Sequence, residues 1–88
     1  MIQFDLLFLY KGMNAVVHVS KIVPVSGNSS YVVEVEEAEK FNIPESILIQ
    51  SDYNEKLAFY YRFGDEVFLK EIAKQILTHC HKNNISVR

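Results

Sequence analysis

Residues 65–82, DEVFLKEIAKQILTHCHK, have the clearest periodic pattern in the chain and predict an amphipathic helix. The apolar side chains, placed at about 100° per residue, fall on one half of the helical wheel: Phe68, Leu69, Ile72, Ala73, Ile76, Leu77 and Cys80. Asp65 is a favourable N-cap, and Glu66 lies in the first turn, where the helix dipole stabilises an acid. Asn83 and Asn84 can adopt the left-handed conformation that ends helices. We therefore expect a helix that buries one face against a sheet.

Upstream of this helix, apolar and polar residues alternate with the period of two that is typical of half-buried strands. The alternation predicts strands over residues 2–10, 15–22, 31–36, 46–50 and 56–63. A two-residue loop at Lys11-Gly12 would place Phe8 opposite Ala15, with the apolar side chains of both strands on one side. A four-residue loop that extends through Asn14 keeps this parity and shifts the partners by two residues.

The expected architecture is an α+β fold, an antiparallel meander of four to five strands with one C-terminal helix packed on one face. The segment 37–44, EAEKFNIP, is either a short helical turn or an irregular crossing that ends before Pro44. The chain has 88 residues, of which 49% are hydrophobic and 23% charged. This size and composition predict a single ordered domain over residues 1–88.

Charge and composition disfavour several classes of function. The net charge of −2 produces no global positive field that would attract nucleic acid or anionic lipid. One cysteine excludes an intramolecular disulfide. No stretch approaches the roughly 20 apolar residues of a membrane span, and the first residues lack the basic region and cleavage site of a signal peptide. We therefore expect a cytoplasmic protein with no membrane contact.

The residues at the end of the helix, LTHCHK over 77–82, hold two of the three histidines and the single cysteine. The helical wheel places Cys80 near the apolar centre, His79 on the flank and His81 on the solvent side. Adjacent helical residues cannot chelate one ion together, and a zinc site needs about four converging ligands. The C-terminal end of a helix also raises a thiol pKa, which weakens a nucleophile. We predict neither a metal site nor a cofactor here.

Asp5 and His18 are the remaining candidates for catalysis, because a two-residue loop places them opposite each other. A carboxylate beside an imidazole can orient a general base. A cross-strand pair on a solvated face has the same geometry without catalysis. No nucleophile or third member can be identified beside them in the sequence, so we predict no catalytic residues and a protein that is not an enzyme.

The sheet face opposite the helix carries the leading functional prediction. It would expose, depending on register, the apolar side chains of Leu7, Leu9, Val16, Val32, Leu48 and Tyr60. Exposed contiguous apolar patches usually mark a contact site. We therefore predict a non-enzymatic domain that binds a protein partner or a second copy of itself, chiefly through Leu7, Leu9, Val16 and Tyr60.

An alternative prediction concerns the outer face of the strand at 56–63. Lys56, Tyr60 and Arg62 combine an aromatic ring with basic groups, a pattern that can stack bases and neutralise phosphates. The alternative is therefore a weak nucleic-acid or small-ligand binder. One ring and two cations are few for this purpose, and acidic residues over 34–39 disfavour nucleic acid.

Overall fold

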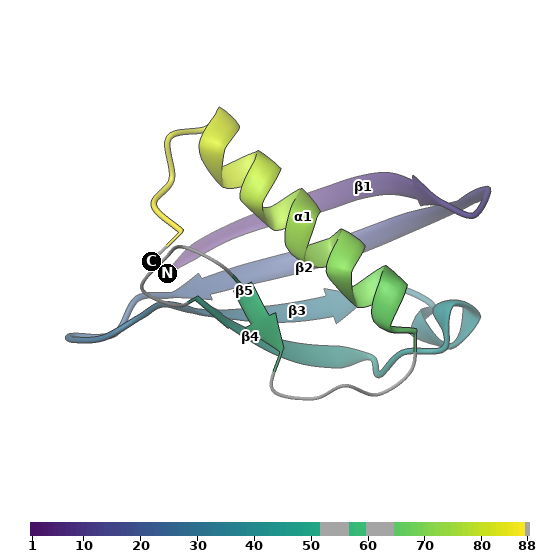
Figure 1. The fold of residues 1–88 in the computed structure, drawn as a ribbon, viewed down its shortest axis with the longest axis horizontal. Coiled ribbons are helices and arrows are strands. Elements are labelled where there is room, and N and C mark those ends of the chain that lie inside the picture. The colour runs from purple at the N-terminus through teal and green to yellow at the C-terminus, as the bar shows by residue number, and fades with distance from the viewer. Residues whose placement is uncertain (52–56, 60–64, 88) are drawn as a thin grey trace.

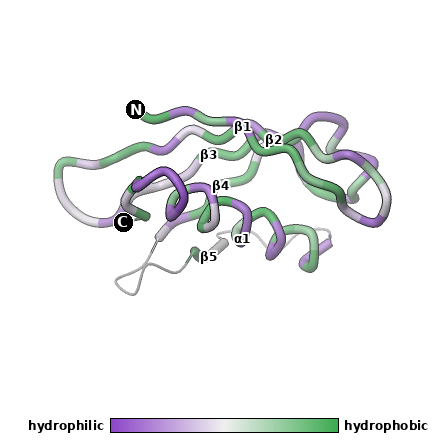
Figure 2. Tube along the Cα trace, turned by 90° about the horizontal axis from the view of Figure 1, so that it is seen from above, coloured by the Kyte–Doolittle hydropathy of each residue, from purple (hydrophilic) through white to green (hydrophobic). Residues whose placement is uncertain are grey.

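The computed structural model describes residues 1–51, 57–59 and 65–87 of the chain. The elements in chain order are β1 (Ile2–Tyr10), β2 (Met13–Ile22), β3 (Ser30–Val35), the 3-10 helix η1 (Ala38–Phe41), β4 (Ser46–Ser51), β5 (Leu57–Phe59) and α1 (Glu66–Lys82). The strands form one antiparallel sheet in the order β1-β2-β3-β4-β5. Helix α1 lies across one face of this sheet, so the fold has two layers (Figures 1 and 2). The predicted α+β meander with a C-terminal helix is confirmed.

The hairpin between β1 and β2 closes through the two-residue loop. Lys11 and Gly12 have φ values of 50° and 78°, the two positive values that a type I′ turn requires. Tyr10 consequently pairs with Met13, and Phe8 pairs with Ala15. The even-numbered residues of β1 therefore share the face that packs against α1, which we call the inner face; the opposite face is the open face.

The segment 37–44 contains the short helical turn, which was one of the two alternatives. Glu37 and Asn42 flank η1 in left-handed conformations, with φ values of 51° and 54°. The buried side chains of Ala38 and Phe41 fasten this turn to the core. The turn therefore connects β3 to β4, and its two buried side chains cover the inner face at that end of the sheet.

Helix α1 packs through the apolar half that its sequence pattern predicts. The buried side chains of α1 are Phe68, Leu69, Ile72, Ala73, Ile76 and Cys80. The Phe68 ring stacks on Phe41, with 4.5 Å between the centroids, and meets the Tyr10 ring edge-on at 4.6 Å. These rings anchor the start of the helix over the ends of β1 and η1. In the part of the chain that the structure describes, no helix has the length and apolar character needed to cross a membrane.

Asp65 connects the start of α1 to the rest of the core. Its side chain accepts hydrogen bonds from the backbone N–H groups of Val67 (3.0 Å) and Phe68 (3.2 Å), which confirms the predicted N-cap. Tyr10 donates its hydroxyl to the same carboxylate at 3.0 Å, and the Asp65 N–H donates to the Asn42 carbonyl at 3.1 Å. The hydrogen bond from the Phe68 N–H lowers the pKa of Asp65, against the opposing effect of burial.

The C-terminal segment after α1 returns to the sheet (Figure 1). Asn84 adopts the left-handed conformation, with φ of 56°, as expected of a residue that ends a helix. The Tyr31 hydroxyl donates to the Val87 carbonyl at 2.6 Å, and the buried Lys21 ammonium donates to the Ser86 carbonyl. Two side chains of the inner face therefore hold this segment over the end of the sheet.

Replacement of Phe68 tests whether this ring anchors the helix. Phe68→Ala should lower the free energy of unfolding by about 3–5 kcal/mol, because the fully buried ring leaves a cavity among Tyr10 and Phe41. The neighbouring Val67 is 64% exposed, so Val67→Ala should change the free energy by less than about 0.5 kcal/mol. Urea unfolding followed by circular dichroism measures both values. Equal losses in the two variants would contradict the packing described here.

Replacement of Tyr31 tests the attachment of the C-terminal segment. Tyr31→Phe keeps the ring and leaves the buried Val87 carbonyl without this donor, which should cost about 1–3 kcal/mol. The amide of Ile85, which donates to the Cys80 carbonyl at 2.8 Å, should then exchange faster with deuterated solvent, whereas amides at the centre of β2 should keep their relative protection. A variant as stable as the parent, with unchanged exchange at Ile85, would show that the hydrogen bond from Tyr31 contributes nothing.

Candidate functional site

The open face exposes an apolar patch beside the edge of the sheet. Leu7 and Leu9 are 74% and 70% exposed, and Val16 lies half-buried directly opposite Leu7. Alternation along β1 and β2 places all three on the open face. We call Leu7, Leu9 and Val16 the leucine patch. Three of the four predicted contact residues are therefore brought together, and the fourth, Tyr60, lies outside the described residues.

A polar row divides the open face. Strand register aligns one residue from each of four strands across this face: Asp5, His18, Glu34 and Ser46. On one side of the row lies the leucine patch. On the other side lie Val32 and Leu48, which are partners across β3 and β4 and are both half-buried. The apolar surface expected on this face is therefore present but interrupted, and the leucine patch is its more exposed part.

His18 occupies the centre of this row between two carboxylates. Its Nδ1 lies 2.7 Å from Asp5 Oδ1, and its Nε2 lies 2.7 Å from Glu36 Oε2. Hydrogen bonds to Asp5 and then to Glu36 raise the pKa of His18 above its ordinary value of 6.5. A protonated ring donates from both nitrogens, so each carboxylate accepts a charge-assisted hydrogen bond. With both nitrogens engaged, the ring joins β1, β2 and the end of β3 and has no free nitrogen for a substrate proton.

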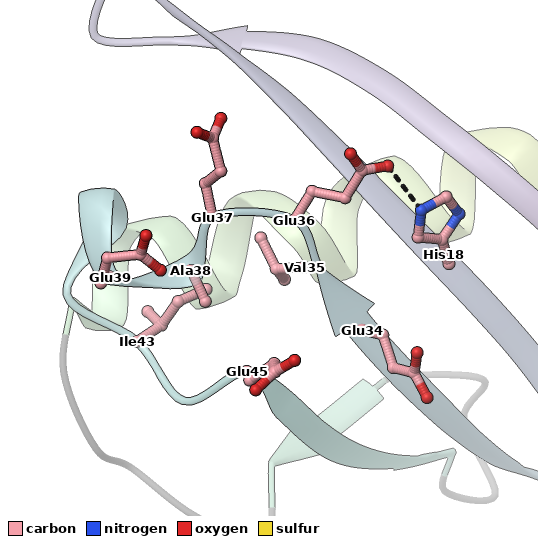
Figure 3. Close-up of a pocket in the computed structure, with 9 residues that line it drawn as sticks. All are labelled: His18, Glu34, Val35, Glu36, Glu37, Ala38, Glu39, Ile43 and Glu45. Atoms are coloured by element: carbon pink, nitrogen blue, oxygen red, sulfur yellow. Dashed lines mark hydrogen bonds and ion pairs between the residues drawn. The ribbon is translucent and has the colours of Figure 1, made fainter.

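An acidic pocket lies next to His18, where β3 ends and β4 begins (Figure 3). It encloses about 480 Å³ and is lined by His18, Glu34, Val35, Glu36, Glu37, Ala38, Glu39, Ile43 and Glu45. Among the described residues, Glu34, Glu39 and Glu45 form no ion pair. Within the same part of the chain, no group of three or more histidine, cysteine or acidic side chains could hold a metal ion. The pocket is therefore an acidic border of the open face.

The residues at the end of α1 occupy three different environments. Cys80 is fully buried, and burial raises the pKa of its thiol. The imidazole of His79 stacks on the ring of Phe4, with 4.1 Å between centroids and 12° between planes. His81 is exposed in the last turn. Cys80 belongs to the core, and His79 closes the gap between the helix and β1, so the stretch shares no common site.

The predicted site and the observed surface differ at two sets of residues. Lys56, Tyr60 and Arg62, which carry the alternative prediction of nucleic-acid or small-ligand binding, lie outside the described residues. The acidic pocket was missed, because Glu45 reaches it through the pairing of β3 with β4. The acidic residues over 34–39 predict a charged surface, but sequence periodicity and composition do not show which other strand end lies next to them.

The pKa of His18 makes the stability of the fold depend on pH. Because folding raises this pKa, the His18 contribution is fully present below the unfolded value near 6.5 and is lost as pH rises through the folded value. The melting temperature should therefore fall more between about pH 6 and about pH 8 in the parent than in His18→Gln. NMR titration of the imidazole should give a midpoint above 6.5, and Asp5→Asn should lower it. A parent midpoint at or below 6.5 would contradict the two-carboxylate geometry.

Neither a protein-family model, nor a curated protein, nor a solved structure matches this chain.

Proposed function

We propose that this chain is a non-enzymatic protein-binding domain whose open face binds a protein segment that carries both apolar and basic side chains. The observation that supports the proposal is the exposure of Leu7 and Leu9 next to an acidic surface. Exposed apolar groups that lie together and are bordered by charges are the usual surface of a contact site.

The leucine patch would supply the apolar part of this contact. Full burial of a leucine side chain contributes roughly 1.5–3 kcal/mol relative to exposure in water. Leu7 and Leu9 are mostly exposed, and Val16 beside Leu7 extends the same surface. A partner that covers the patch therefore gains most from these two leucines, which makes them the expected centre of the contact.

The acidic side chains on and beside the open face indicate which kind of partner would bind there. Asp5, Glu34 and Glu36 lie on or beside the open face, and Glu39 and Glu45 border the adjacent pocket. A second copy laid face to face would bring these acids close to one another, and like charges opposite each other are unfavourable. Phosphates would be repelled for the same reason. Lysine or arginine side chains of a protein partner complement this surface.

Two synthetic seven-residue peptides test the proposal, one with alternating leucine and lysine and one with alternating leucine and glutamate. The leucine-lysine peptide should shift the amide signals of Leu7, Leu9 and Val16 in NMR spectra, and its affinity should fall as salt increases. The leucine-glutamate peptide should bind at least about tenfold more weakly.

Variants separate the leucine patch from other apolar surface. The double variant Leu7→Thr/Leu9→Thr should lower the affinity of the leucine-lysine peptide about tenfold or more. Val67→Thr, at an exposed position on α1, is the matched control and should leave the affinity unchanged. Equal binding of both peptides, shifts centred on α1, or stronger shifts with single-stranded RNA or DNA would each contradict the proposal.

A further inference from the structure

β1 forms one edge of the sheet, because it pairs with β2 on one side and with no described strand on the other. The type I′ turn makes Tyr10 and Met13 a hydrogen-bonded pair, and such pairs alternate with non-hydrogen-bonded pairs along antiparallel strands. The backbone groups of Tyr10 and every second residue before it therefore point toward β2. Those that point outward belong to Gln3, Asp5, Leu7 and Leu9.

In the described part of the chain, this edge has one charged side chain and no other feature of the kind that normally prevents strand addition. Natural edge strands are short, or carry lysine, proline or a bulge. β1 has nine residues, IQFDLLFLY, with no proline and no lysine, and it pairs with β2 without interruption from Ile2 to Tyr10. Its single charge, Asp5, is already engaged by His18. Helix α1 lies in the second layer and so does not fill the position beside β1 in the sheet (Figure 2).

We propose that β1 pairs with β1 of a second copy of this chain in an antiparallel register that places Leu6 opposite the partner's Leu6. The two sheets then become one, and the two-fold axis passes between the Leu6 residues. Phe4 meets the partner's Phe8, and both rings are half-buried in one copy. This assignment concerns the edge of the sheet, so it stands apart from the partner proposed for the open face.

The register follows from the outward-pointing groups and from charge. With Leu6 at the centre all nine residues are paired, and the outward groups form the hydrogen-bonded pairs: Gln3 with the partner's Leu9, and Asp5 with the partner's Leu7. A shift of two residues in one direction places Asp5 opposite the partner's Asp5, which is unfavourable. A shift of two in the other direction leaves Ile2 and Gln3 unpaired.

The helix explains why a second copy fits this edge better than an unrelated strand. α1 crosses the sheet obliquely, and its C-terminal end lies toward β1 (Figure 1), where His79 stacks on Phe4. The first turn, with Asp65 as N-cap and Glu66, is acidic, whereas the last turn contains His79, His81 and Lys82. The two-fold axis reverses the helix direction. Lys82 of one helix therefore lies on the side of Glu66 of the other, and these two charges are complementary.

Sedimentation equilibrium tests the assembly with two substitutions at one position. The parent should sediment at twice the chain mass of 10.2 kDa. Leu7→Pro removes an outward N–H that β2 does not use, so it should sediment as a monomer with an unchanged circular dichroism spectrum. Leu7→Thr keeps that N–H and should remain a dimer, and Leu7→Thr/Leu9→Thr should also remain a dimer although it loses peptide binding. A monomeric parent at millimolar concentration would overturn the proposal.

Hydrogen exchange and cross-linking test the register without relying on proline. Amides of Asp5 and Leu7 should exchange at least about 100-fold slower in the dimer than after dilution to monomer. Leu6→Cys should form a disulfide-linked dimer on oxidation, since its Cα atoms would lie about 4.5 Å apart. Phe4→Cys, opposite the partner's Phe8, should not cross-link. Unprotected outward amides, or cross-linking of Phe4→Cys but not of Leu6→Cys, would overturn the register.

Discussion

Phe68 and the rings around it hold a single helix against one face of the sheet, and the rest of the structure depends on this contact. Tyr10 meets Phe68 edge-on and also donates its hydroxyl to the N-cap Asp65, so one residue of β1 serves both the core and the helix start. One helix can cover only one face of a sheet of this width. Among the described residues, the helix leaves the open face and the β1 edge uncovered, and our two proposals concern these surfaces.

Charge gives these two surfaces different properties. On the open face, Asp5 and Glu36 hold His18 between them, and further acids border the pocket next to it. In our proposal, this surface disfavours its own copy and complements a basic partner. The edge carries a single charge, already paired, and its backbone groups are complementary to those of an identical strand. The two proposed contacts therefore differ in kind: one uses side chains of the open face, and the other uses backbone groups of the β1 edge.

Much of the fold could be predicted because its signals are local. The apolar half of α1, the N-cap at Asp65 and the parity of the first hairpin each follow from residues close together in sequence. The burial of Cys80 followed from the same helical wheel. The candidate site was predictable to the same extent: parity alone puts Leu7, Leu9 and Val16 on one face. The acidic pocket was not, because it joins residues near His18 to Glu45 through two separate strand pairings.

The sequence by itself determined the helix, the approximate positions of the described strands and which side of these elements is apolar, because periodicity and capping act over a few residues. Only the tertiary structure decided the two-residue loop, the strand order and the contact of His18 with Glu36, since these depend on how distant segments pair. It also decided that a polar row divides the open face. The pairing register of four strands aligns the residues of this row, and no pattern within a single strand predicts that alignment.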